Sequence, residues 1–250
     1  MDLLLRDKVT LITGGARGLG LEMAEAFYRE GSKIVLLDID GNGVDSSAQK
    51  LDQTGERVMA CQAAVTDEEQ VYSTVQKILA RFGRIDILIN SAGLLKNNPI
   101  EEMSLADFEL ILKVNVTGIF IMCKAVVPVM KKQGGGKIIN LASLSGRTGR
   151  PGVGVNYGAS KAGVIGLTRT LAREVGLAGI YVNVIAPGPI MTDMTKDMPQ
   201  ELRDRLNFGR AVDRAGMPKD VSDAALFLGS SMSDWMNGVV LDVNGGILMR

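Results

Sequence analysis

A glycine-rich turn between a strand and a helix constrains the fold of this chain more than any other feature. Residues 9–12 form a short apolar run of β type, and an amphipathic helix begins at about Gly18. Glycine lets backbone and ligand approach where a Cβ would collide. The free N–H groups and the dipole at the start of such a helix favour an anion such as a pyrophosphate. The turn is therefore a candidate nucleotide-binding element, and we place these residues at the cofactor: Gly14, Arg17, Gly18, Leu19 and Gly20.

An acidic residue, Asp38, ends the next apolar run, residues 33–38. A carboxylate there accepts hydrogen bonds from the ribose hydroxyls of NAD and repels the extra phosphate of NADP. Arg17 argues the other way, because a guanidinium pairs with a 2′-phosphate; the alternative is an exposed turn arginine. We favour NAD(H), with NADP(H) as the alternative cofactor.

Apolar strands alternate with helices along the whole chain, without a linker or an internal repeat. Strand patterns lie near 8–12, 33–38, 57–61, 85–89, 136–142, 179–185 and 238–243, and helical patterns near 18–30, 43–54, 67–82, 104–132, 156–176 and 218–230. This alternation predicts an α/β fold, a single doubly wound Rossmann domain over residues 1–250. Its seven-stranded parallel sheet is flanked by helices on both faces, and a ligand lies at the carboxyl ends of the strands.

Residues 189–217 interrupt the alternation and form a candidate substrate-binding loop or lid. The segment is bounded by prolines and rich in methionine: Met191, Met194, Met198 and Met217. Methionines adapt to apolar shapes, although a composition without functional meaning is the alternative. Its arginines, Arg203, Arg205 and Arg210, either meet an anionic substrate or, as we favour, are solvated helix charges.

Composition excludes several classes of function. The 28 basic and 28 acidic residues cancel, and aromatic residues are few, which argues against a nucleic-acid surface. The chain has no histidine, so histidine bases and histidine metal sites are excluded, and we expect no metal. Cys61 and Cys123 follow no metal or redox spacing and are expected to be reduced and buried. We see no signal peptide and no membrane span, and expect a cytoplasmic protein.

Two asparagines are candidates for a site at the sheet edge. Asn90 ends an apolar strand and is expected to hold neighbouring strands by backbone bonds. The small residues Ala92 and Gly93 come shortly after it, and a cofactor could lie over them. A plain turn is the alternative. Asn115 stands in an apolar helix that disfavours it and needs a buried partner. Asn115 either makes a structural hydrogen bond within the protein or binds a water molecule at a functional site.

A serine, a tyrosine and a lysine form a candidate proton relay. Ser143 follows the strand at 136–142, and Tyr157 and Lys161 share one face of the next helix because they are four residues apart. A nearby ammonium favours the phenolate and lowers the pKa of a tyrosine, and the serine could donate to a substrate oxygen. Alone, such a pair is a common surface feature. After a serine-ended strand in a nucleotide-binding sheet, it indicates acid–base chemistry on a carbonyl or alcohol.

Together these motifs resemble those of the short-chain dehydrogenase/reductase family, over essentially the whole chain. The resemblance rests on the glycine turn with Thr13, the run Asn90 to Gly93, Asn115, Ser143, Tyr157 with Lys161, Pro187-Gly188 with Thr192, and Val243 to Gly246. It implies that Tyr157 is the general acid/base, that Ser143 polarises the reacting oxygen and that Asn115 holds a water. Lys161 would hold the nicotinamide ribose, and Val65 would border the adenine. The cofactor site would also include Pro187, Gly188, Ile190 and Thr192 at the carboxamide.

Among relatives the chain resembles the 3-oxoacyl-(acyl-carrier-protein) reductases, especially in the runs Leu171 to Glu174 and Val182 to Val184, but it also departs from them. Ala64 stands where aspartate is common, and Asn244 replaces an aspartate. The resemblance places Gln133 and Ala178 where those reductases carry the arginines that dock their carrier, and those enzymes usually take NADPH. Our leading hypothesis is therefore an NAD(H)-dependent oxidoreductase that interconverts a secondary alcohol and a ketone.

The alternatives are an NADPH-dependent 3-oxoacyl-(acyl-carrier-protein) reductase of fatty-acid synthesis and, from another class, a non-catalytic dinucleotide-binding sensor or scaffold. The partner is a small-molecule alcohol or ketone, not a nucleic acid or a membrane. The resemblance also implies a homotetramer, with contacts through 104–132, 156–176 and 238–243.

Overall fold

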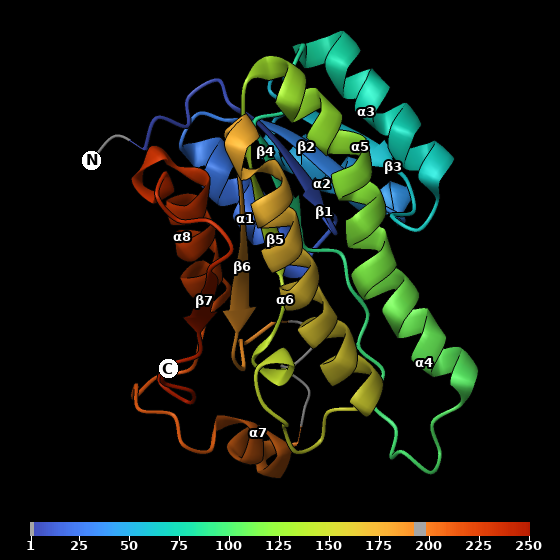
Figure 1. Cartoon of the computed structure of the whole chain (residues 1–250), viewed down its shortest axis with the longest axis vertical. Helices are drawn as coiled ribbons and strands as arrows, with labels where there is room; N and C mark the ends of the chain where they lie inside the picture. The colour runs from blue at the N-terminus through green and yellow to red at the C-terminus, as the bar shows by residue number, and fades with distance from the viewer. Residues whose placement is uncertain (1–2, 193–198) are drawn as a thin grey trace.

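A seven-stranded parallel sheet forms the centre of the molecule (Figure 1). The computed structural model describes residues 3–192 and 199–250. The strands are β1 (Val9–Thr13), β2 (Lys33–Asp38), β3 (Val58–Gln62), β4 (Ile87–Asn90), β5 (Gly136–Leu141), β6 (Ile180–Pro187) and β7 (Val240–Val243). Their order is β3-β2-β1-β4-β5-β6-β7, and every neighbouring pair is parallel. The predicted doubly wound α/β fold is confirmed.

Helices cover both faces of the sheet. The α-helices are α1 (Gly18–Arg29), α2 (Gly41–Leu51), α3 (Glu68–Phe82), α4 (Leu105–Leu112), α5 (Gly118–Gln133), α6 (Val155–Val175), α7 (Gln200–Asn207) and α8 (Pro218–Gly229). Short turns η2 (Leu144–Gly146), η3 (Gly176–Ala178) and η4 (Ser231–Ser233) are 3₁₀-helical, and η1 (Lys113–Thr117) is π-helical. Helices α3, α5 and α6 pack on one face, and α1, α2 and α8 on the other.

The core consists of two apolar layers, one on each face of the sheet. Strand β1 is buried throughout, and its residues alternate between the layers: Leu11 packs with α3, α5 and α6, whereas Ile12 packs with α1 and α8. This alternation follows from the period of two of a strand. Cys61 and Cys123 are buried free thiols in the layer that packs with α3, α5 and α6. Burial raises the pKa of Cys61 to about 11 and that of Cys123 to about 12.

The strand order reverses between β1 and β4. Strand β1 pairs with β2 on one side and β4 on the other, so crossovers leave it in opposite directions. The register aligns Thr13 with Asn90, and Asn90 with Asn140, at the carboxyl ends. In open parallel sheets this reversal is where ligands bind. The structure therefore brings the glycine turn and the end of β4 to one edge.

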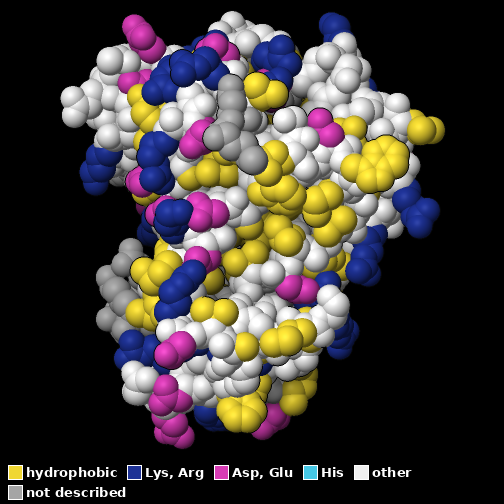
Figure 2. Space-filling view, turned by 90° about the vertical axis from the view of Figure 1, so that its left-hand side faces the viewer, with side chains coloured by type: hydrophobic (Ala, Val, Ile, Leu, Met, Phe, Trp, Pro, Cys, Tyr) yellow, Lys and Arg dark blue, Asp and Glu magenta, His cyan; other side chains and the backbone are white. Residues whose placement is uncertain are grey.

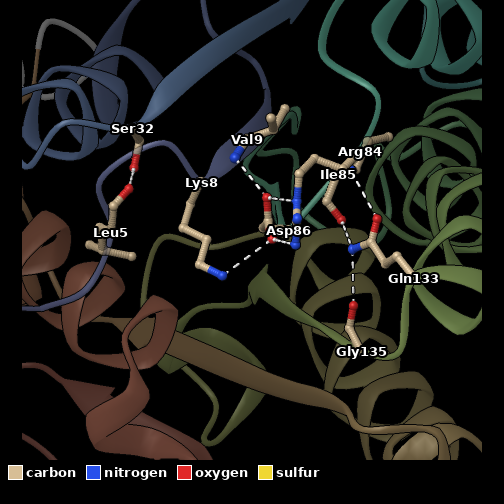
Figure 3. A network of polar contacts seen from close by, with 9 residues as sticks. All are labelled: Leu5, Lys8, Val9, Ser32, Arg84, Ile85, Asp86, Gln133 and Gly135. Atoms are coloured by element: carbon tan, nitrogen blue, oxygen red, sulfur yellow. Dashed lines mark hydrogen bonds and ion pairs between the residues drawn. The ribbon is translucent and has the colours of Figure 1, made fainter.

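The opposite edge is closed by a polar network around Asp86 (Figure 3). The buried Asp86 carboxylate accepts hydrogen bonds from Val9 N at 2.9 Å and from Arg84 Nε at 2.8 Å, and pairs with Lys8 Nζ at 3.5 Å. Nearby, Gln133 Nε2 donates to Ile85 O at 2.7 Å. These contacts join the amino ends of β1 and β4 to the end of α5, which makes this edge a structural one.

One element differs from the expected pattern, and one predicted helix has a composition that bears on the membrane expectation. The candidate substrate-binding loop at 189–217 contains helix α7, which its weak periodicity did not predict. Met194 and Met198 of this loop lie outside the described residues. Residues Leu105–Gln133 run on as one helical stretch that is long and apolar enough, by length and composition, to cross a membrane. Its buried residues Met122, Cys123 and Val126 pack against the sheet, so this composition is that of a core helix.

Candidate active site

The glycine turn is as tight as the sequence predicts, and either close packing or backbone conformation requires glycine at each of its three positions. A Cβ on Gly20 would lie 2.1 Å from the carbonyl oxygen of Gly14, and Gly14 itself packs on the backbone of Ala92. Gly14 and Gly18 have φ values of +70° and +62°, which favour glycine. Arg17 occupies the N-cap of α1 without a side-chain hydrogen bond, so the helix start is open to an anion. Leu19, the second residue of α1, is partly buried and packs against the core.

Asp38 is anchored to this turn by hydrogen bonds. Its Oδ2 accepts from Ala16 N and its Oδ1 from Asp40 N, each at 3.1 Å. Each carboxylate oxygen has a second lone pair for a ligand hydroxyl. Arg17 is largely exposed, and its Nη1 lies 4.0 Å from Asp40 Oδ2. The guanidinium is therefore directed toward a second carboxylate at the rim of the site.

The loop after β4 is held by side chains from neighbouring strands. Thr13 Oγ1 accepts from Ser91 N at 3.1 Å and Ala92 N at 3.0 Å. Asn90 pairs with Thr13 and with Asn140 in the sheet register, and its Nδ2 also donates to Asn140 Oδ1 at 2.8 Å, so it joins the next strand through its side chain as well. A Cβ on Gly93 would lie 3.2 Å from Asn115 Oδ1 and 3.6 Å from Lys161 Nζ. The loop after β4 thus lies directly against Asn115 and Lys161 at Gly93.

Asn115 lies fully buried in the π-helical turn η1 and is bonded to protein groups. Its Oδ1 accepts from Leu94 N at 2.8 Å, and its Nδ2 donates to Leu94 O and Ser160 Oγ at 3.0 Å. Of the two alternatives that the sequence left open, the side chain makes the structural hydrogen bonds. π-Helical turns inside longer helices occur frequently at functional sites.

Ser143 and Tyr157 meet at the carboxyl end of β5. Ser143 caps η2 and accepts from Ser145 N at 3.1 Å, which leaves its hydroxyl proton free to be donated. Tyr157 lies in the first turn of α6. Burial raises the pKa of its phenol, and a hydrogen bond with Ser143 opposes that rise. The predicted pair is therefore brought together.

Lys161 lies one turn further along α6 and is buried. Its Nζ donates to Leu141 O at 2.8 Å and lies 5.6 Å from the centre of the Tyr157 ring. Burial lowers the pKa of Lys161 to about 8. The expected lowering of the tyrosine pKa by this ammonium is wrong here, because desolvation of the phenol dominates. Tyr157 consequently holds its proton at neutral pH.

The remaining predicted residues line the same edge. Pro187 ends β6, and a Cβ on the following Gly188 would lie 2.9 Å from Asn244. Ile190 is buried and forms a parallel bridge with Gly216, and Thr192 makes further contacts. Val65 packs against Gly118, where a Cβ would lie 2.7 Å from Val65 Cγ2. All predicted site residues thus belong to described parts of the carboxyl edge or of the helices that follow it.

Sequence reasoning missed a set of buried polar residues behind the site. Asn140 Nδ2 donates to Thr168 Oγ1 at 2.9 Å, and Ser160 Oγ donates to Tyr157 O at 2.8 Å. Asn156 Oδ1 accepts from Tyr157 N, and its Nδ2 is buried without a partner among the described residues. In the sequence, the only signal that could have identified these residues was a polar side chain at a helix or strand position that faces the core.

Comparisons with known proteins agree with this geometry. A family model described as enoyl-(acyl carrier protein) reductase matches residues 14–248. A 3-oxoacyl-(acyl-carrier-protein) reductase FabG of Chlamydia muridarum is 38% identical over 99% of this chain and 100% of its own length. The Escherichia coli enzyme of that name is 36% identical, over 97% and 98% respectively.

Solved structures agree as well. A 7α-hydroxysteroid dehydrogenase in complex with NADH and 7-oxo glycochenodeoxycholic acid superposes with a TM-score of 0.92 at 33% identity, covering 98% of this chain and 96% of that one. The structure of gox2181 gives 0.94 at 32% identity, with 98% and 97% covered. The chain belongs to the short-chain dehydrogenase/reductase family. It is an oxidoreductase that acts on CH–OH groups.

Proposed function

We propose that this protein reduces a ketone to a secondary alcohol with a nicotinamide nucleotide, and that the ketone is a 3-oxoacyl thioester. One observation carries the catalytic part: the Ser143 hydroxyl lies close enough to the Tyr157 phenol to oppose the rise of its pKa, and the buried Lys161 lies on the same face of α6. The relatives named as 3-oxoacyl-(acyl-carrier-protein) reductases support the choice of thioester. The bound nucleotide supplies the hydride.

The chain's own residues handle the proton. Because burial keeps Tyr157 protonated at neutral pH, its phenol is an acid that can donate to the carbonyl oxygen. The free Ser143 proton stabilises the same oxygen as negative charge develops on it. Lys161, whose pKa is lowered to about 8, can be cationic when the phenolate forms and can release a proton afterwards. In the opposite direction the same groups accept the proton from an alcohol.

We assign NAD(H) as the preferred nucleotide. The open N-terminus of α1 and the tight turn at Gly14 and Gly20 fit a pyrophosphate. Asp38 would accept the ribose hydroxyls, and Asp40 adds a second negative charge that engages Arg17. Two carboxylates at one rim disfavour a 2′-phosphate.

A second candidate is NAD(H)-dependent oxidation or reduction of another alcohol–ketone pair. It is favoured by Gln133, whose amide is turned inward to Ile85 and Gly135 instead of outward as a carrier-docking group (Figure 3). The hydroxysteroid dehydrogenase among the structural relatives shows such a substrate class.

The test follows nicotinamide absorbance with an acetoacetyl thioester, once with NADH and once with NADPH. Faster oxidation of NADH supports the full proposal, whereas faster oxidation of NADPH overturns the nucleotide assignment. Tyr157→Phe should abolish turnover and leave NADH binding unchanged; unchanged turnover would overturn the mechanism. Activity on hydroxysteroids or other alcohols alone supports the second candidate.

We also propose a homotetramer in the cytoplasm. Hydrophobic side chains gather on the face formed by α8 and β7 (Figure 2), where every residue of β7 is partly exposed. On the α4–α5 stretch Leu105 and Phe120 are exposed. Large exposed apolar areas are typical of interfaces. Sedimentation that yields the mass of one chain would contradict this assembly.

A further inference from the structure

Helix α7 lies against the loop that joins the two catalytic residues. Residues 147–154 lead from the turn at Ser143 to Tyr157. Leu202 of α7 approaches this loop so closely that a Cβ on Gly152 would lie 3.1 Å from Leu202 Cδ1, and Arg150 donates to the carbonyl of Leu206. Figure 1 shows α7 beyond the carboxyl ends of the strands, on the side where substrate must approach. A substrate that reaches Ser143 and extends outward therefore passes close to α7.

Two arginines at this junction have no acidic partner among the residues that the structure describes. Arg203 follows Leu202 on α7, is half-buried, and its Nε is buried with no hydrogen-bond partner in the part of the chain that the structure describes. Within those same residues, no carboxylate forms an ion pair with Arg203 or with the half-buried Arg150. Asp204, the acidic neighbour on α7, is exposed and accepts instead from Gln200 Nε2 at 2.7 Å.

This arrangement is unlike that of an ordinary surface arginine. A buried N–H without an acceptor lowers stability, so such groups are rare unless a ligand satisfies them. Guanidinium groups bind carboxylate and phosphate in a planar, two-bond geometry. Arg205, two residues along the same helix, is exposed and fits the solvated charge that the sequence favoured for all three arginines. For Arg203 that interpretation does not hold.

We infer that Arg203, assisted by Arg150, binds an anionic group of the substrate remote from the reacting ketone. The inference rests on the proposed function, because it needs the ketone to lie at Ser143 and Tyr157. The substrate is then a ketone with a phosphate or carboxylate at its far end. Two sources share this chemistry: the phosphate of a 4′-phosphopantetheine thioester, and the carboxylate of a keto acid.

Binding titrations with matched ligands test the inference without turnover. The NADH-loaded enzyme is titrated calorimetrically with 4′-phosphopantetheine and with pantetheine, and separately with a 7-oxo bile acid and its methyl ester. In at least one pair the anion should bind about tenfold more tightly, as expected for a hydrogen-bonded charge pair. The pair that shows the preference identifies the phosphate or the carboxylate source.

Variants then assign that preference to Arg203. Arg203→Gln should abolish it, Arg150→Gln should reduce it, and the matched control Arg205→Gln should retain it. Arg203→Lys, which keeps the charge, should retain part of it and serves if the glutamine variant fails to fold. Equal affinities within both ligand pairs, or equal losses in the Arg203→Gln and Arg205→Gln variants, would overturn the inference. Failure of the catalytic proposal is seen separately, as turnover that survives Tyr157→Phe.

Discussion

Asn115 Nδ2 and Ser160 Oγ are joined by a 3.0 Å hydrogen bond between the π-helical turn η1 and helix α6. The Asn115 side chain also accepts a hydrogen bond from the backbone N–H of Leu94 and donates one to the Leu94 carbonyl. Ser160 in turn donates to the carbonyl of Tyr157. One buried amide thus connects the loop after β4 with the helical turn that carries the Tyr157 phenol.

Replacing Asn115 should therefore affect stability and catalysis together. Asn115→Ala leaves the buried groups of Leu94 and Ser160 without their partner, so we expect the free energy of unfolding to fall by about 2–4 kcal/mol. Turnover should fall at least about tenfold because Tyr157 loses its fixed position. Urea unfolding and steady-state kinetics measure both. Asn42→Ala, at an exposed position of α2, is the control, and an equal effect of the two changes would contradict this role.

The charge of Asp38 should determine nucleotide preference. Asp38→Asn removes the charge but keeps a side-chain oxygen to accept one of the hydrogen bonds from Ala16 N or Asp40 N. We expect the ratio of NADH to NADPH affinity to fall about tenfold, since repulsion of the 2′-phosphate is relieved. Fluorescence titration with each nucleotide gives the ratio. Asp45→Asn, exposed on α2, should leave it unchanged; an unaltered ratio in Asp38→Asn would remove Asp38 as the determinant.

Lys161 should impose a pH dependence on stability. Its pKa falls from 10.5 to about 8 on folding because it is buried. Below pH 8 both states bind the proton, and the native state bears the full desolvation penalty, about 3 kcal/mol for this shift. Between about 8 and 10.5 the unfolded chain binds more protons, so the free energy of unfolding rises with pH.

A Lys161→Met variant isolates this contribution from those of other groups. Its free energy of unfolding should exceed that of the unaltered protein below pH 8, and the difference should shrink as pH rises toward 10.5. Urea unfolding at several pH values provides the comparison. A difference that stays constant across this range would show that Lys161 does not titrate there.

The polar chain behind the site should stabilise the sheet. Thr168→Val removes the hydroxyl that accepts from Asn140 Nδ2 and leaves that amide unpaired within the core. We expect a loss of about 1–3 kcal/mol in the free energy of unfolding. Thr170→Val, the same exchange at an exposed position of α6, should change it by less than about 0.5 kcal/mol. Similar losses in both variants would mean that the buried bond contributes little.

Much of the fold followed from local patterns in the chain. The strands were predicted to within about two residues because buried parallel strands are continuous apolar runs, as in Leu36 of β2 or Ile89 of β4. Helix α7 was missed because its exposed, charged residues leave no apolar periodicity. The spacing of Tyr157 and Lys161 placed both on one helix face, but it carried no information on desolvation, and the sign of the tyrosine pKa shift was therefore wrong.

The sequence by itself determined the sheet, the glycine turn and the types of residue at the carboxyl edge, since these depend on short-range periodicity and on backbone sterics. Only the tertiary structure decided which polar groups find partners: Asn115 with Leu94, Gln133 with Ile85, and Arg203 Nε with no partner among the described residues. Hydrogen-bond satisfaction and burial depend on segments far apart in the chain. For that reason the environment of each charge, and with it the substrate that the site favours, becomes visible only in the folded molecule.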